Sequence, residues 1–200
     1  MGDTTILSQL QKRFLELVIK EKTIVRDFYW TGGTVLSEFY LHHRDSEDID
    51  LFTDREEIRI GPVKSMISKF GGILEANKIG YTQYLGLHTF TFYFDGGESL
   101  KVDFNYYPFT RLEKGGKYGG LVRDFIDLYM IIKKYNFSVS ELIKIARSKF
   151  DRYTDPVQLA GKFLMVRQAM DLPKMRIKLS EEEWRSFFED QAMKLESMVF

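Results

Sequence analysis

Residues 31–53 read TGGTVLSEFYLHHRDSEDIDLFT, and this stretch decides the fold that we expect for the chain. Gly32 and Gly33 follow a run rich in β-branched and aromatic residues and precede a helical pattern, which predicts a strand-to-helix turn. Asp48-Ile49-Asp50 alternates acidic and apolar residues, as a strand with one buried face does. The stretch therefore predicts a strand, a glycine turn, a helix and a second strand.

The two aspartates of this stretch have the spacing of a metal pair. Residues at i and i+2 of a strand point to the same face, so Asp48 and Asp50 could share one cation. Carboxylates this close repel each other unless a positive charge lies between them. Mg²⁺, or Mn²⁺ in its place, prefers such oxygen ligands. Exposed acids on a strand edge remain the alternative interpretation.

The glycines upstream give the acidic pair a chemical context. Gly32, Gly33 and Thr34 would let backbone amides approach a phosphate at a helix N-terminus, and the Thr34 hydroxyl could donate to a phosphate oxygen. Arg44 and Ser46 could also reach a triphosphate, the former through its bidentate guanidinium. A helix entry that simply needs small residues, and a surface arginine, are the alternatives. Taken together, these residues predict a site for a nucleoside triphosphate (NTP) with bound metal.

A third acid lies on a later predicted strand. In Lys101-Val102-Asp103-Phe104 the apolar residues share one face, and Lys101 and Asp103 share the other. Asp103 could be a further metal ligand or the base that deprotonates an attacking hydroxyl.

The chain as a whole predicts an α+β protein with a helical C-terminal region. Its N-terminal part (1–110) should form a mixed β-sheet flanked by helices, and a glycine-rich stretch separates it from a helical region (111–200). The expected helices cover residues 5–20, 35–42, 62–70, 123–135, 138–150, 155–170 and 181–198. The expected strands cover residues 23–31, 48–53, 73–85, 88–94 and 99–106, and Ser138/Glu141 and Ser180/Glu183 have capping-box spacing.

Composition and charge limit the environment and the partners. The chain has no cysteine and a net charge of zero, and no apolar run approaches the length of a membrane span, so we expect a cytoplasmic protein without a membrane partner. Residues 1–110 carry 12 basic and 16 acidic side chains, whereas residues 111–178 carry 15 basic and 7 acidic. The second segment could bind a polyanion such as RNA, or could be the solvated face of ordinary helices.

The spacing of these motifs resembles the DNA polymerase β-like nucleotidyltransferase superfamily. More narrowly, the stretch resembles the AbiEii/AbiGii family, the nucleotidyltransferase toxins of abortive-infection, type IV toxin–antitoxin systems. That family's first motif, GGT-x-L followed by R-x-S-x-D-I-D-L, is matched at every position by residues 32–36 and 44–51. Its later motif, R-D-x-x-D-L, is matched by residues 123–128.

The resemblance implies a set of roles and a function. By it, Asp48, Asp50 and Asp103 bind metal, Asp124 or Asp127 adds a carboxylate, and Gly32, Gly33, Thr34, Arg44 and Ser46 surround the triphosphate. The implied reaction moves a nucleotide from an NTP to an acceptor hydroxyl, for which tRNA is the expected acceptor, and an antitoxin is a possible partner.

One departure from the family pattern keeps other functions open. The family usually has a lysine-bearing helix before the second motif, whereas here the glycine-rich stretch with Lys114 and Lys117 runs directly into Arg123. The alternatives are a catalytically impaired nucleotidyltransferase fold that binds RNA or an antitoxin, and a small-molecule nucleotidyltransferase of the antibiotic-modifying kind.

Overall fold

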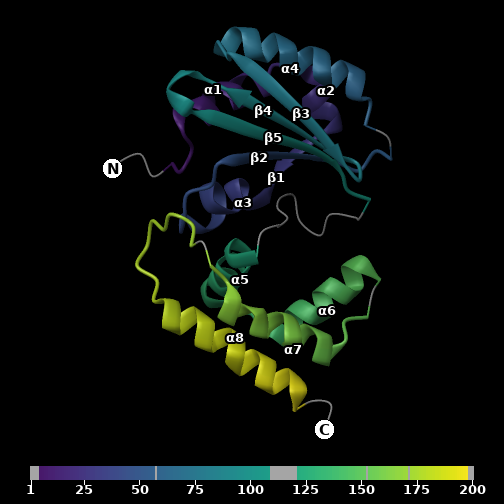
Figure 1. Cartoon of the computed structure of the whole chain (residues 1–200). Helices are drawn as coiled ribbons and strands as arrows, with labels where there is room; N and C mark the ends of the chain where they lie inside the picture. The colour runs from purple at the N-terminus through teal and green to yellow at the C-terminus, as the bar shows by residue number, and fades with distance from the viewer. Residues whose placement is uncertain (1–4, 57, 109–120, 152, 171, 198–200) are drawn as a thin grey trace. The chain divides into compact units, whose positions relative to one another are not determined.

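The computed structural model describes residues 5–56, 58–108, 121–151, 153–170 and 172–197. The chain forms two compact units, residues 1–117 and 118–200, and each is described by itself (Figure 1). The boundary that the sequence predicts at residues 110–111, and with it Lys114 and Lys117, lies outside the described residues.

The first unit is built on a mixed five-stranded sheet. The strands are β1 (Tyr29–Thr31), β2 (Asp48–Thr53), β3 (Lys78–Tyr84), β4 (Leu87–Tyr93) and β5 (Ser99–Tyr106), in the order β1-β2-β5-β4-β3. The pair β2 and β5 is parallel, and every other neighbouring pair is antiparallel. The α+β class and the mixed sheet flanked by helices are therefore confirmed, and β2 and β5 have the predicted bounds.

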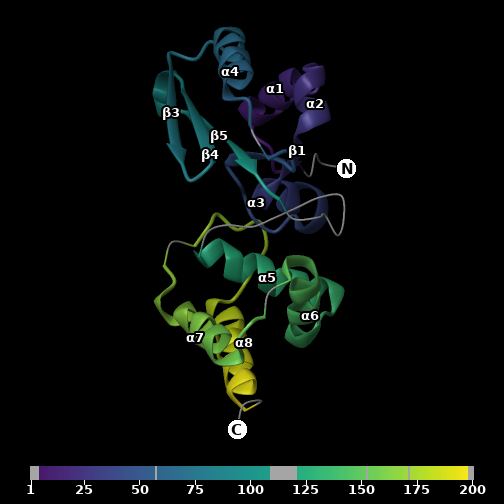
Figure 2. The same cartoon turned by 90° about the vertical axis from the view of Figure 1, so that its right-hand side faces the viewer.

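Helices α1 (Gln9–Val18), α2 (Lys22–Asp27) and α4 (Ile60–Leu74) pack on one face of this sheet (Figure 2). Alternate strand residues such as Ile49 and Val102, both 0% exposed, face these helices. Phe14 of α1 lies at the centre, with its ring 5.6 Å from the ring of Phe70 and 5.6 Å from that of Phe92. A closely packed apolar layer therefore supports β2 and β5 from behind, which leaves their other face for polar side chains.

The opposite face carries the glycine turn. Helix α3 (Gly32–Val35) continues directly into the π-helical turn η1 (Leu36–Leu41), which ends at His42 in the left-handed conformation. The predicted helix is thus present, but it begins at Gly32, three residues earlier than expected. A π-helical turn adds one residue per turn, and such turns often occur next to functional sites.

Two local predictions for this unit were wrong. Residues 22–27 form helix α2, where the sequence predicted a strand over residues 23–31. In this helix Ile24 is buried in the core while Val25 is 56% exposed. Of the predicted strand, only Tyr29–Thr31 pairs with β2. Helix α4 does not stop at Gly71-Gly72 but runs through both glycines to Leu74. Ile79 of β3 packs directly on Gly71, where a Cβ would meet its Cδ1 at 2.4 Å. The glycine therefore serves close packing, and tertiary contacts override local propensity in both places.

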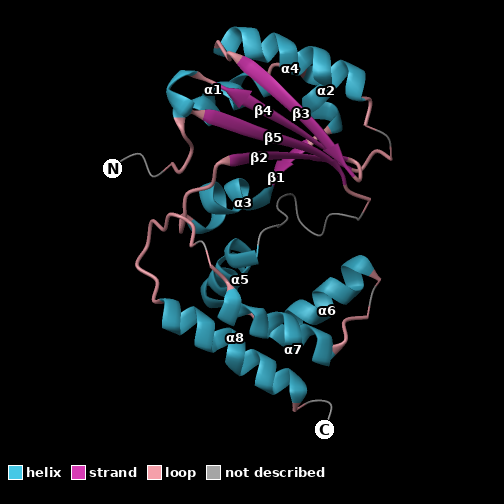
Figure 3. Ribbon diagram, in the orientation of Figure 1, coloured by secondary structure: helices cyan, strands magenta, loops and turns pink. Residues whose placement is uncertain are grey.

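The second unit is helical in its described residues (Figure 3). It contains α5 (Leu121–Tyr135), α6 (Val139–Phe150), α7 (Pro156–Leu164), the 3-10 turn η3 (Met165–Gln168) and α8 (Glu181–Glu196). Its core surrounds Trp184 and Phe188, both 0% exposed. Ser138 forms the predicted capping box with Glu141. Ser180 makes no side-chain cap hydrogen bond, and Glu183 accepts a hydrogen bond from the Tyr129 hydroxyl.

Candidate active site on the acidic face of the sheet

The parallel pairing of β2 and β5 brings the three predicted acids of the first unit together. Asp50 is the direct neighbour of Asp103, and Asp48 is the neighbour of Lys101. Because β2 and β5 bury their alternate apolar residues on the helical side, all four polar side chains lie on the other face. Residues separated by about fifty positions in the chain thus form one cluster.

Lys101 is the cation of this cluster, and the sequence interpretation did not include it as a site residue. Its Nζ lies 3.2 Å from Oδ2 of Asp48 and 3.0 Å from Oδ2 of Asp103. Burial by itself would lower the pKa of Lys101, but its hydrogen bond with Asp103 and the charge of Asp48 outweigh burial and raise that pKa. Its position two residues before Asp103 on a strand was a signal for it, because the two side chains must share a face.

The Asp50 carboxyl of this cluster has a raised pKa. Burial, followed by the charges of Asp103 and Asp48, raises the pKa of Asp50 to about 7, although Lys101 acts in the opposite direction. Near neutral pH a part of the Asp50 carboxyl groups is therefore protonated and neutral, because the charge of Lys101 does not offset burial and the two neighbouring acids.

Asp103 is held on both of its oxygens. Oδ1 accepts a hydrogen bond of 2.6 Å from the Thr89 hydroxyl of β4, and Oδ2 faces Lys101. The side chain is 6% exposed. Thr89 is a second residue that sequence reasoning missed, because only the β4–β5 register places it opposite Asp103.

The glycine turn lies directly against Asp50. Gly32 has a φ of +82°, a backbone conformation that residues with a side chain rarely adopt. A Cβ there would meet Oδ2 of Asp50 at 1.8 Å. A Cβ on Gly33 would meet Nη2 of Arg44 at 2.4 Å, the far end of a long side chain, and Gly33 does not have the positive φ of Gly32. Gly32 is therefore the stricter requirement, and it allows the backbone to touch the carboxylate.

The Thr34 hydroxyl has two partners within the protein. Thr34 is 0% exposed, and its hydroxyl lies 2.8 Å from Oγ of Ser46 and within hydrogen-bonding distance of the Asp48 carbonyl oxygen. A hydroxyl has one proton, so donation to that carbonyl leaves Thr34 only an acceptor for Ser46. In this structure the Thr34 side chain ties the glycine turn to β2, and its donation to a phosphate stays a prediction.

The loop before β2 is buried as well. Arg44 is 2% exposed, and its Nη1 donates to the Asp45 carbonyl at 3.1 Å, while Ser46 is 9% exposed. Nε2 of Gln11 on α1 donates to the Ser46 carbonyl at 2.9 Å. The loop is thus fixed by its own contacts and by α1.

The remaining predicted acids belong to the second unit. Asp124 and Asp127 both lie on α5, and Asp127 is 1% exposed. Their participation in the site stays a prediction.

The chemistry of the acidic face suits a hard cation, but the face is not a complete cage for one. Among the described residues, no group of three or more histidine or acidic side chains is arranged to hold a metal ion. The ammonium of Lys101 lies between Asp48 and Asp103. Mg²⁺ is commonly held by one or two carboxylates together with substrate phosphates. Asp48 and Asp50 fit that mode, in which the remaining ligands come from the substrate.

The described residues thus define an α+β protein with a lysine-bridged acidic cluster beside a glycine turn.

No family model matches the chain. None of its described helices is long and apolar enough to span a membrane.

Individual proteins similar to the chain come from two organisms. The "Uncharacterized protein aq_aa25" of Aquifex aeolicus is 27% identical over 166 residues, which cover 72% of this chain and 76% of that protein. A solved Helicobacter pylori structure described as a "putative nucleotidyltransferase" has a TM-score of 0.49 and 17% identity, and the match covers 96% of this chain and 97% of that one. The H. pylori protein JHP933 has the same TM-score and identity, with coverages of 96% and 94%.

Proposed function

We propose that the chain is a metal-dependent nucleotidyltransferase that moves a nucleotide from an NTP to an acceptor hydroxyl. The single observation that carries this proposal is the register of β2 and β5, which joins Asp50 to Asp103 beside the backbone of Gly32. Like-charged groups gathered on a rigid sheet, one of them with a raised pKa, are typical of a site that receives a cation.

In this proposal each side chain has a defined task. Asp48 and Asp50 would hold Mg²⁺ or Mn²⁺, which would neutralise phosphate charge and act as a Lewis acid when bound. Asp103, oriented by Thr89 and Lys101, would take the proton of the acceptor hydroxyl or bind a further cation. The acceptor oxygen would form a bond to the α-phosphorus, the bond between the α- and β-phosphates would break, and pyrophosphate would leave.

The acceptor proposed for this reaction is RNA, with tRNA as the first to be examined. The excess of basic over acidic residues in 111–178 supports a polyanionic acceptor such as RNA. By the motif resemblance, the activity would be that of a toxin in a type IV toxin–antitoxin system, and an antitoxin would be its partner. Transfer to tRNA should then decline steeply as salt concentration rises, because phosphate contacts release counterions.

The test is incubation with radiolabelled NTPs, Mg²⁺ and total tRNA. Wild-type protein should transfer label to RNA, and Asp50→Ala should reduce the transfer by at least about a hundredfold. Asp54→Ala is the matched control, since this exposed acid follows β2 without belonging to the cluster. Transfer that is unchanged in Asp50→Ala would refute the assigned role of the cluster.

A second candidate function is a nucleotidyltransferase fold without catalysis that binds RNA or an antitoxin. The ammonium of Lys101 between two of the acids favours it, because this cation could replace a metal structurally. It predicts RNA binding without label transfer in the same assay. Label transfer to an aminoglycoside but not to RNA would instead support a small-molecule acceptor.

A further inference from the structure

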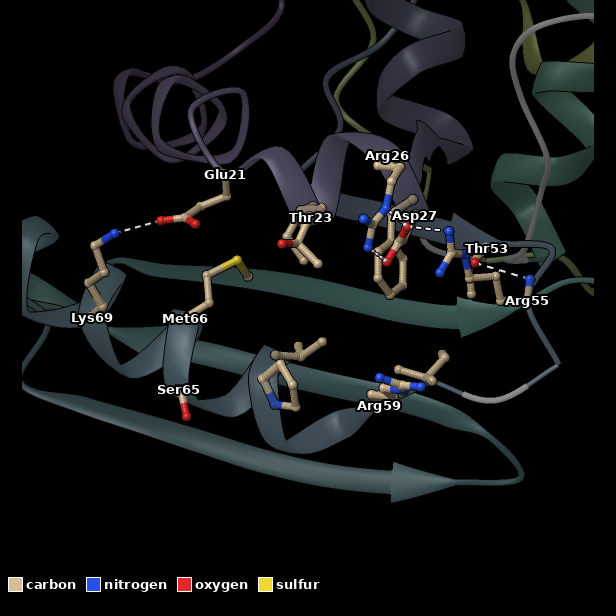
Figure 4. Close-up of a pocket in the computed structure, with 15 residues that line it drawn as sticks. Glu21, Thr23, Arg26, Asp27, Thr53, Arg55, Arg59, Ser65, Met66 and Lys69 are labelled. Carbon is tan, nitrogen blue, oxygen red and sulfur yellow. Dashed lines mark hydrogen bonds and ion pairs between the residues drawn. The ribbon is translucent and has the colours of Figure 1, made fainter.

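A pocket of about 580 Å³ lies in the first unit, on the helical side of the sheet (Figure 4). Its lining comes mainly from α2, the first part of α4 and the segment between β2 and α4, which contributes Arg55, Ile58 and Arg59. None of the predicted site residues contributes to it. The volume falls within the range of small-molecule sites in proteins. The pocket is therefore separate from the acidic face and needs its own explanation.

The two ends of the pocket differ in charge. At one end, Nζ of Lys69 pairs with Oε1 of Glu21 at 2.5 Å, so the charges balance (Figure 4). At the other end, Asp27 accepts from Nε of Arg26 at 2.7 Å. The same Asp27 oxygen lies 2.6 Å from Nη2 of Arg55. The Asp27 carboxylate thus forms ion pairs with two guanidinium groups at this end.

Arg59 adds a further positive charge to the same end. It lines the pocket, and it makes no ion pair with any side chain that the structure describes. The hydrogen bond from Arg26, together with the charges of Arg55 and Arg59, holds the pKa of Asp27 below its ordinary value. Three guanidinium groups therefore face one carboxylate, which leaves an excess of positive charge.

The lining of the pocket also includes apolar side chains, namely Ile24, Phe28, Ile58, Val63 and Met66. In Figure 4 the thioether of Met66 lies between the two charged ends. Water in such a space gains few hydrogen bonds, whereas a hydrocarbon or aromatic group would bury apolar area.

We propose that this pocket binds a small amphiphilic anion, with its apolar body between α2 and α4 and its carboxylate or phosphate group at Arg55 and Arg59. Guanidinium groups match both kinds of anion through paired hydrogen bonds. This inference is independent of the activity proposed for the acidic face.

The test is isothermal titration calorimetry of the full chain with octanoate, octyl phosphate and octan-1-ol. Octanoate or octyl phosphate should bind once per chain and at least about tenfold more tightly than the neutral alcohol, because only the anions engage the arginines. The tighter of the two anions identifies the class of head group.

Variants locate this binding on the chain. Arg59→Gln should weaken anion binding about tenfold. Thr23→Trp, at an exposed position on the pocket wall, should abolish it by filling the space. Arg13→Gln is the matched control, since Arg13 is an exposed arginine on α1 outside the pocket.

Circular dichroism confirms that each variant is folded before titration. Equal affinity for octanol and the anions, no saturable binding, or unchanged binding in Arg59→Gln or Thr23→Trp would each overturn the proposal.

Discussion

Asp50→Asn should stabilise the protein at alkaline pH and leave it almost unchanged at acidic pH. The pKa of Asp50 in the folded chain is about 7, against an ordinary value of 3.8. The folded state therefore binds a proton that the unfolded state releases, and stability falls as pH rises from about 4 to about 7. An asparagine of nearly the same shape has no charge to bury, so its stability should not fall in this range.

The magnitude follows from the shift. A shift of about three pKa units corresponds to about 4 kcal/mol of unfolding free energy. Relaxation of the neighbouring acids would reduce this value, so we expect about 2–4 kcal/mol between pH 4 and pH 8 in the absence of divalent ions.

Urea denaturation followed by tryptophan fluorescence measures this difference. Trp30 lies on β1 in the same unit as Asp50, whereas Trp184 belongs to the other unit, so a Trp184→Phe background makes the signal specific. Asp54→Asn, the same change at an exposed acid outside the cluster, is the matched control.

Mg²⁺ adds a second readout. At pH 8 it should raise the stability of the wild-type protein, because it binds the folded state, and should have little effect on Asp50→Asn. Parallel pH profiles for wild type and Asp50→Asn would refute the reasoning about the buried charge. An equal effect of Mg²⁺ on both would refute the metal assignment.

Three further changes test other parts of the structure. Gly32→Ala should destabilise the first unit by more than about 3 kcal/mol, because its new Cβ would collide with Asp50. Gly86→Ala, with nearly the same φ but open space around it, should lose only the roughly 1–2 kcal/mol of backbone strain. Similar urea midpoints for the two variants would contradict the close contact. Lys101→Met should destabilise the metal-free protein by about 1–3 kcal/mol, because two carboxylates lose their cation, and Mg²⁺ should restore part of the loss in thermal melts. Ser138→Ala should lower the free energy of unfolding of the second unit by about 1 kcal/mol, because the Ser138 side chain caps α6. Ser180→Ala should lower it by much less, because the Ser180 side chain makes no cap hydrogen bond. Equal losses would mean that the cap is unimportant.

Prediction from sequence was most accurate where local pattern and tertiary contacts agree. The alternation in β2 and β5 needs one buried face, and the core provides it, so both strands were predicted with their observed bounds. The pattern of residues 23–28 favours a strand, but the core accepts Ile24 from a helix. Gly71 resembles a helix stop, yet it provides space for Ile79.

The candidate site shows the same division. Spacing alone placed Asp48 and Asp50 on one strand face, and it placed Lys101 on the same face as Asp103. Spacing could not show that Lys101 bridges Asp48 and Asp103, because that contact depends on the pairing of two distant strands. It also could not show that Thr34 is committed to the loop before β2.

The sequence by itself determined the α+β class, the strands that carry the acids and the glycine turn beside them, because side-chain period and glycine conformation are local properties. The tertiary structure alone decided the neighbours of each acid, and therefore the raised pKa of Asp50 and the cation beside Asp103. It also created the arginine-lined pocket, whose residues come from α2, from α4 and from the segment between β2 and α4, which only folding brings together. Electrostatic interaction and burial depend on distance in space, which the order of residues along a chain does not specify.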